Sequence, residues 1–169
     1  LGIDMGLKSF LVTSDGEEID IPKYYRKSER RLRTLQKRLS RRQKGSKRRG
    51  KAVTAVAKQH KKVADKRRDF HHKTANKLVE KAEVIAYEKL NIKGLARTRM
   101  SKSINDAGWG QFLTILAFKA GKAGQLTVAV NPNGTTIECS ECGERVPKTL
   151  SQRVHNCPSC GTVMGRDKL

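Results

Sequence analysis

The sequence has few acidic residues, few aromatic residues and no long apolar run. Of its 169 residues, 16 are Asp or Glu and 37 are Lys or Arg, so the formal net charge is +21 at pH 7. No stretch approaches the roughly 20 apolar residues that a membrane-spanning helix needs, and residues 1–25 lack the layout of a secretory signal. We therefore expect a soluble, intracellular protein, whose charge calls for a polyanionic partner.

The positive charge is concentrated in one third of the chain, because residues 23–77 hold 23 bases and only three acids. Within this segment Leu32, Leu35 and Leu39 recur at helical spacing, and after Gly45, Ser46 and Gly50 the spacing resumes from Val53 through Val56, Val63 and Phe70. The pattern predicts two helices joined by a basic turn. Unscreened charge of this density would repel itself, so we expect phosphate contacts. The arginines assigned to them here are Arg38, Arg41, Arg42, Arg48 and Arg49.

The remaining segments predict a sheet with helices on its faces. Strands are expected near residues 1–5, 10–13 and 18–21, with a hairpin signal at Ser14-Asp15-Gly16, and further strands near 83–88 and 126–130. Residues 90–103 are expected to form a loop, on which Arg97 and Arg99 are further candidates for nucleic-acid contact. An amphipathic helix is expected from Trp109 to Ala120, with Trp109 as its core anchor. Strands separated by helices pair in parallel, so the predicted fold is α/β with a mixed sheet.

All four cysteines lie near the C-terminus, in two Cys-x-x-Cys pairs separated by fourteen residues. They are Cys139, Cys142, Cys157 and Cys160, and each pair is followed by glycine. This spacing is typical of a zinc ribbon, in which four thiolates fill a closed tetrahedral site of structural function. Disulfides are the alternative, but a protein with this charge belongs in a reducing compartment. With the ligand set complete, His155 is expected to be a surface or stacking residue.

Three acids stand at positions where a catalytic metal site could form. Asp4 lies in the first strand, Glu88 ends the fourth, and Asp167 follows the ribbon. Converging at one sheet edge, three carboxylates could hold two Mg²⁺ ions, which prefer hard oxygen ligands and cleave phosphodiesters. Taken singly, a strand-end acid is more often a turn or capping residue.

These motifs together resemble the RuvC nuclease domain of TnpB proteins, the transposon-encoded OrfB family related to type V CRISPR effectors. The resemblance rests on three stretches in the family's order along nearly the whole chain: Gly2-Ile3-Asp4-Met5-Gly6, Tyr87-Glu88-Lys89-Leu90-Asn91, and the ribbon from Cys139 to Cys160 followed by Arg166-Asp167. The resemblance implies an RNase H-like (RuvC) fold formed by residues 1–130 and 161–169, with a basic helical insert at 22–82 and a zinc ribbon at 131–160.

The same resemblance implies RNA-guided cleavage of DNA at a two-metal site. Asp4, Glu88 and Asp167 would be the catalytic, magnesium-binding carboxylates, and the partners would be a guide RNA and a target DNA. Further domains would precede Leu1, and the location would be the prokaryotic cytoplasm, in association with the nucleoid. An alternative is a catalytically silent RNA-guided module that binds DNA or recruits other factors. A junction-resolving nuclease is a weaker alternative, because the ribbon and the Arg-rich insert fit it poorly.

Overall fold

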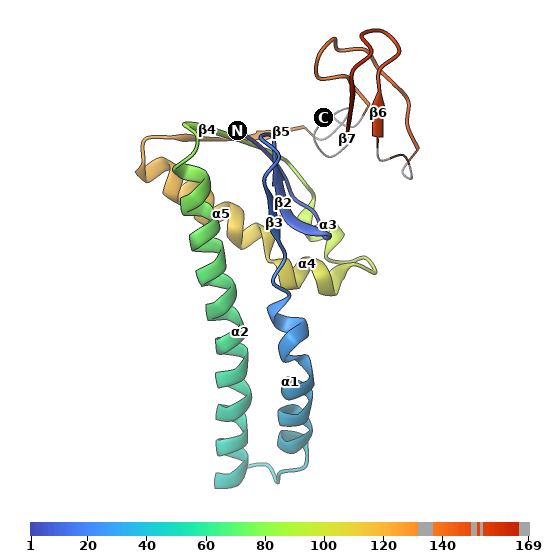
Figure 1. Ribbon diagram of the computed structural model, residues 1–169. Helices are drawn as coiled ribbons and strands as arrows, with labels where there is room; N and C mark the ends of the chain where they lie inside the picture. Colours follow the sequence, from blue (N-terminus) through green and yellow to red (C-terminus); the bar gives the residue numbers. More distant parts are fainter. Residues whose placement is uncertain (132–136, 150–151, 153, 166–169) are drawn as a thin grey trace. The chain divides into compact units, whose positions relative to one another are not determined.

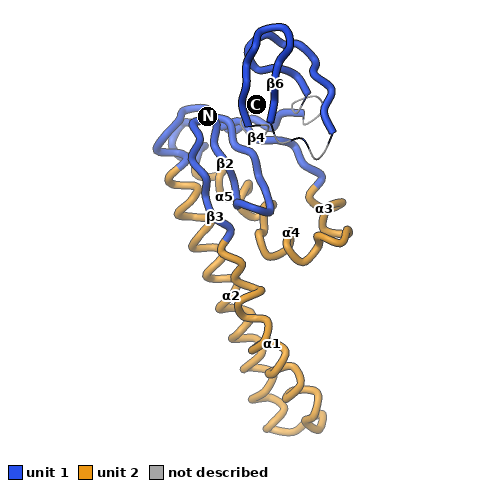
Figure 2. Tube along the Cα trace, turned by 45° about the vertical axis from the view of Figure 1, so that its right-hand side comes forward, with its two compact units in different colours: residues 1–21, 78–91, 120–169 blue, residues 22–77, 92–119 orange. Residues whose placement is uncertain are grey.

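The computed structural model describes residues 1–131, 137–149, 152 and 154–165. The chain divides into two compact units (Figure 2): unit 1 comprises residues 1–21, 78–91 and 120–169, and unit 2 comprises residues 22–77 and 92–119. No helix in these described ranges has the length and apolar character needed to cross a membrane. In chain order the elements are β1 (Gly2–Asp4), β2 (Ser9–Thr13), β3 (Glu18–Asp20), α1 (Tyr24–Ser40), α2 (Lys47–Val79), β4 (Val84–Glu88), α3 (Ile92–Leu95), α4 (Ser101–Ala107), α5 (Trp109–Lys122), β5 (Leu126–Val130), β6 (Val154–Asn156) and β7 (Val163–Gly165).

Unit 1 is built on a mixed sheet with the strand order β3-β2-β1-β4-β5 (Figure 1). The first three strands pair antiparallel, as short turns allow, whereas β4 pairs in parallel with both β1 and β5. The predicted strands and the mixed sheet are thus confirmed. Its interior contains Phe10, Leu11 and Ile85, all fully buried.

The two faces of the β4–β5 pair differ in exposure. Ile85 is fully buried, whereas Val84 on the opposite face is exposed, since successive side chains alternate along a strand. The register pairs Val84 with Leu126 and Ala86 with Val128, so Leu126 and Val128 share the face of Val84. Leu126 is 64% exposed and Val128 is exposed too. The described residues therefore leave an apolar strip along this edge of the sheet uncovered.

Unit 2 is dominated by the antiparallel hairpin of α1 and α2, which lie side by side in both views (Figures 1 and 2). Two helices joined by a basic turn were predicted, and this prediction is confirmed. Leu32 and Val63 are buried, as their spacing indicated. The prediction for Val53 is wrong, because Val53 is 48% exposed and the neighbouring Ala52 is 7% exposed. The small side chain of Ala52 faces inward in its place.

The segment expected to be a loop, residues 90–103, contains α3 and the start of α4, whereas residues 96–100, with Arg97 and Arg99, lie outside these helices as predicted. The start of α4 was missed because α4 is a short helix held by tertiary contacts. Ile104, Asp106 and Ala107 are all buried. A seven-residue helix is too short to be stable by itself in water, so local sequence carries little signal for it.

A buried carboxylate of α4 caps the first basic helix. The helix α1 has no acid in its first turn, and Lys23 before it makes no side-chain capping bond. Asp106, whose side chain is 1% exposed, instead accepts hydrogen bonds from the backbone N–H groups of Tyr25 (2.7 Å) and Arg26 (3.1 Å). Its Oδ1 also lies 3.8 Å from Nη2 of Arg67. The capping acid thus comes from a distant part of the chain. It accepts hydrogen bonds from N–H groups at the helix N-terminus that have no partner within the helix.

The corner between α4 and α5 depends on a glycine. Gly108 has a φ of 69°, which glycine adopts without strain, and a Cβ there would lie 2.8 Å from Cδ of Arg67. Beyond this corner Trp109, Phe112 and Leu116 are buried, which confirms both the predicted helix and the role of Trp109 as a core anchor.

Replacing Asp106 by alanine should destabilise the protein by about 1–3 kcal/mol, because the N–H donors of α1 and the Arg67 guanidinium lose a buried acceptor. Urea denaturation followed by circular dichroism measures this loss. Asp69→Ala is the matched control, since Asp69 pairs with Lys73 at an exposed site. The control should change stability by less than about 1 kcal/mol. Equal losses in both variants would contradict the capping role.

The buried histidine of α2 should make stability depend on pH. Burial lowers the pKa of His71 from 6.5 to about 4, and its Nε2 lies 2.9 Å from the carbonyl oxygen of Ala107. A lowered folded-state pKa means that the unfolded chain takes up the proton first, so stability falls as the pH drops from about 6.5 toward 4. At pH 5 the loss should be about 2 kcal/mol relative to pH 7.5. Thermal melts across this pH range test the effect, since stability in His71→Gln should no longer fall between about pH 6.5 and pH 4. An equal fall in stability in His71→Gln and in the unaltered protein would contradict the role of His71.

Candidate functional site

The parallel pairing of β1 with β4 places two of the candidate acids next to each other. Gly2 pairs with Ala86 and Ile3 with Tyr87, so the next positions along both strands are Asp4 and Glu88. Both strands end at these acids, and both side chains are partly exposed. Residues opposite each other on neighbouring strands project from the same face of a sheet. Asp4 and Glu88 therefore share one face at the carboxyl-terminal edge of two parallel strands.

This edge has the chemistry of a site for a hard cation. Carboxylate oxygens are the ligands that Mg²⁺ prefers, and one or two carboxylates commonly suffice to hold it. In open sheets, functional groups gather beyond the carboxyl ends of parallel strands. The third candidate, Asp167, lies outside the described residues.

The four cysteines form a compact cluster. Their Sγ atoms all lie within 4.8 Å of one another, with 3.7 Å between Cys139 and Cys160 and 3.5 Å between Cys142 and Cys157. Four sulfurs arranged tetrahedrally at about 2.3 Å from a zinc ion would be about 3.8 Å apart. The cluster thus fits zinc in both ligand type and spacing. The isolated bridge between Glu138 and Arg145 and the β6–β7 hairpin flank the two cysteine pairs.

The thiols of this cluster influence each other's ionisation. Hydrogen bonding to the Thr162 hydroxyl, 3.1 Å from Sγ, lowers the pKa of Cys160 to about 6. A backbone hydrogen bond at Glu144 favours the Cys142 thiolate, yet burial and the neighbouring thiols outweigh it and raise the pKa of Cys142 to about 12. The raised pKa means that Cys142 resists losing its proton. A divalent cation at the centre of the cluster would remove that resistance, because a metal-bound thiol is deprotonated.

Of the two positions expected for His155, at the surface or as a stacking residue, the surface position is wrong. Its side chain is 0% exposed, and its residue pairs with Met164 across the β6–β7 hairpin. A module this small has few residues with which to fill an interior, so a ring of intermediate polarity occupies one of its central positions. No sequence signal distinguished this histidine from a solvent-facing one.

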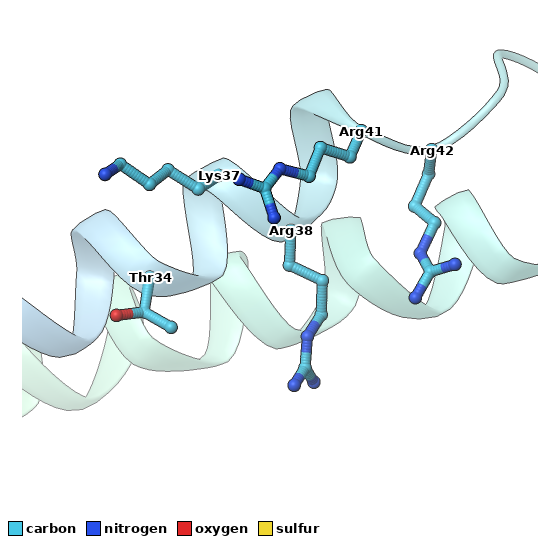
Figure 3. Close-up of a pocket in the computed structure, with 5 residues that line it drawn as sticks. All are labelled: Thr34, Lys37, Arg38, Arg41 and Arg42. Atoms are coloured by element: carbon cyan, nitrogen blue, oxygen red, sulfur yellow. The ribbon is translucent and has the colours of Figure 1, made fainter.

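The arginines predicted to contact phosphates begin at the end of α1. Arg38, Arg41 and Arg42 line a groove of about 430 Å³ together with Thr34 and Lys37 (Figure 3). All three arginines are exposed, as is Arg48 at the start of α2. Arg97 and Arg99 are also exposed and belong to unit 2, whereas Glu88 belongs to unit 1.

Arg49 differs from the other candidates because its guanidinium group forms hydrogen bonds within the α1–α2 hairpin. Its Nη1 donates hydrogen bonds to the backbone carbonyls of Leu39 (3.2 Å) and Arg42 (3.1 Å). It thereby bonds carbonyls at and just beyond the C-terminal end of α1, where basic side chains commonly bond the last carbonyls of a helix. The sequence could not separate this structural arginine from its neighbours, since all of them sit in one basic run.

Known proteins match nearly the whole length of this chain. The model of the OrfB_IS605 family, described as "Probable transposase", matches residues 1–99, and that of the "Cas12f1-like, TNB domain" matches residues 109–169. A "Putative RNA-guided DNA endonuclease" of Streptomyces pristinaespiralis is 34% identical over 172 residues, which cover 99% of this chain and 42% of that protein. "Putative RNA-guided DNA endonuclease InsQ" of Escherichia coli K12 is 27% identical over 174 residues, covering 93% of this chain and 43% of that protein.

Solved structures share the fold. A CRISPR-Cas12f ternary complex matches 98% of this chain and 36% of the other with a TM-score of 0.63 at 22% identity. A complex of Cas12f1 with single guide RNA and target DNA gives a TM-score of 0.60 at 16% identity, covering 98% of this chain and 46% of the other. The chain therefore spans less than half the length of these relatives. Because the OrfB_IS605 model matches more than half of the chain, the resemblance to TnpB proteins is confirmed and this protein belongs to the OrfB_IS605 family.

Proposed function

We propose that this chain is the nuclease portion of an RNA-guided DNA endonuclease of the TnpB type. The observation that carries the proposal is the register of β1 and β4, which sets Asp4 beside Glu88 at one sheet edge. The names of the relatives from Streptomyces and Escherichia support the same activity. The β3-β2-β1-β4-β5 order, with β1 and β4 parallel in a mixed sheet, is compatible with an RNase H-like (RuvC) arrangement.

In this proposal Asp4, Glu88 and Asp167 would hold two Mg²⁺ ions. When bound, these ions would supply an activated water and stabilise the leaving oxygen of a phosphodiester. The protein itself positions the ligands, since the parallel pairing of β1 and β4 fixes the Asp4 and Glu88 carboxylates relative to each other. Residues 1–130 and 161–169 would form this nuclease domain, with residues 22–82 inserted as the basic hairpin.

The zinc ribbon, residues 131–160 in this proposal, has a structural function. Cys139, Cys142, Cys157 and Cys160 would occupy all four positions around zinc, which leaves none for a substrate or a water molecule. The soft thiolates and the hard carboxylates select different ions, so the two metals need not compete for the same ligands.

Nucleic acid is the partner that the charge distribution supports. A guide RNA and a target DNA would both present phosphates to the exposed arginines of the α1–α2 hairpin and to Arg97 and Arg99. Sequence choice would come from base pairing of the guide with the target rather than from side chains.

Asp4→Ala and Glu88→Ala should each reduce Mg²⁺-dependent DNA cleavage by more than about 100-fold, because groups that merely support metal ligands already cost 10–100-fold when removed. Cleavage of labelled DNA by the protein purified with its accompanying RNA measures this. Asp20→Ala is the control, since Asp20 is an exposed acid at the end of β3. Binding should persist in all variants. DNA binding by the unaltered protein without any cleavage would favour the silent, recruiting module instead.

The purified protein should contain about one zinc per chain by inductively coupled plasma mass spectrometry. Cys139→Ser and Cys157→Ser should lose the metal and unfold the ribbon at a lower temperature, because zinc binding contributes directly to the folding of such modules. Ser140→Ala is the matched control, as Ser140 lies between two ligands and is itself exposed. Full zinc content in Cys157→Ser would refute the four-thiolate site.

A further inference from the structure

The strands that hold the two neighbouring carboxylates come from the most acidic part of the chain. Residues 1–21 contain one base and five acids, and residues 78–91 contain two bases and three acids, so these two segments of unit 1 carry a net charge of −5. A DNA strand is itself a polyanion, and even two bound Mg²⁺ ions would not reverse the charge of these segments. A cation close to this sheet edge would therefore favour the approach of a phosphodiester to Asp4 and Glu88.

Two of the three bases in these segments are already paired or lie on the other face of the sheet. The Nζ of Lys81 lies 3.3 Å from Oδ2 of Asp15 and is also paired with the Glu17 carboxylate, so its charge is offset within unit 1. The backbone N–H of Lys89 donates to a carbonyl of β5 at 2.8 Å, which extends the parallel ladder one residue beyond Glu88. Because successive side chains alternate along a strand, Lys89 projects from the face opposite to that of Glu88.

The third base, Lys8, lies in the turn that joins β1 to β2. Since β1 ends at Asp4 and β2 begins at Ser9, this turn lies beyond the carboxyl end of β1, at the edge that Asp4 shares with Glu88. Four residues span at most about 14 Å, which limits the distance between the Cα atoms of Lys8 and Asp4. That length corresponds to about four nucleotides of a B-form strand, at about 3.4 Å each. Lys8 is exposed, and among the residues that the structure describes no ion pair includes it.

The turn that carries Lys8 is held at both of its ends. The Gly6 N–H donates to the Phe10 carbonyl at 3.3 Å, and Phe10 is fully buried. A Cβ on Gly6 would lie only 3.2 Å from the Ser9 carbonyl oxygen, so glycine permits the close approach of the chain to itself at this point. The Ser9 hydroxyl in turn donates a hydrogen bond to the Glu18 carboxylate of β3. The Lys8 backbone is therefore ordered before a ligand binds, which lowers the entropy cost of a contact.

We propose that Lys8 contacts a backbone phosphate of the DNA strand that is cut, within about four nucleotides of the scissile bond, and holds that strand against the sheet edge. Its ammonium group is a compact charge with three donors, which suits a contact with phosphate oxygens that is independent of sequence. This inference rests on the proposed nuclease function and deepens it, since it adds a residue that holds the substrate. The contact is the same before and during cleavage, so it acts on binding of the strand rather than on the chemical step.

The first test is the kinetics of DNA cleavage by the protein purified with its accompanying RNA. Lys8→Gln should raise KM by about 5-fold, the upper range for one exposed charge pair, and leave kcat nearly unchanged. Lys8→Arg keeps the charge and should restore KM. Lys89→Gln is the matched control, because it removes an equal charge from the opposite face of the sheet and should leave KM unchanged. An equal rise of KM in Lys8→Gln and Lys89→Gln, or a fall in kcat alone, would overturn the proposal.

A second test locates the contact with a neutral phosphate. A methylphosphonate is placed in turn at each phosphate within about four nucleotides of the cut, and DNA binding is measured in the Asp4→Ala background, which should not cleave. At one position the neutral group should weaken binding about 5-fold. Adding Lys8→Gln should abolish this loss, because both changes remove the same contact, whereas adding Lys89→Gln should preserve it. Losses that simply add at every position would refute the contact.

The Asp4→Ala background also separates this proposal from the nuclease proposal. In it, Lys8→Gln should lower the slope of log affinity for a single-stranded DNA against log salt by about 0.7, the value for one lost phosphate contact. A slope that depends on Lys8, together with an unaltered protein that never cleaves, would refute the nuclease alone. Cleavage by the unaltered protein, with a KM and a salt slope that Lys8→Gln leaves unchanged, would refute the Lys8 contact alone.

Discussion

The parallel pairing of β1 with β4 is the constraint on which the candidate catalytic site depends. These strands come from residues 2–4 and 84–88, and the long helical hairpin lies between them in the chain. Their ladder turns two isolated strand-end acids into neighbours on one face of the sheet. Without that register, Asp4 and Glu88 would be two ordinary acids with no reason to share a metal ion.

A chain with this much positive charge must offset the repulsion within its own fold, and its few acids do so at particular places. Asp106 is the buried example, because it caps α1 and faces Arg67. Glu29 pairs with Arg33 and Lys102 on the surface, and on α2 Asp65 and Asp69 pair with lysines. These acids all lie outside residues 37–51, the segment in which α1 turns into α2 and in which no Asp or Glu occurs.

The two candidate metal sites follow opposite chemical rules. Four cysteine sulfurs form a compact cluster that a single zinc ion could fill, and in the proposed function this ion would hold a small module together. The sheet edge presents carboxylates that are partly exposed, as a site must be if a phosphodiester is to reach it. Because cysteine sulfurs and carboxylate oxygens prefer different metal ions, each candidate site would bind its own kind of ion.

Sequence by itself determined the features whose signal is local. Periodic leucines predicted the basic helices, alternation predicted the strands, and the spacing of Cys139, Cys142, Cys157 and Cys160 predicted their cluster, because each pattern lies within one helix, strand or pair of turns. Only the tertiary structure decided that Asp106 caps a helix about eighty residues away, that Arg49 serves the fold rather than the surface, that His155 is buried and that residues 101–107 are helical. Each of these depends on a partner distant in the chain or on the packing around it, which no local pattern of residues encodes.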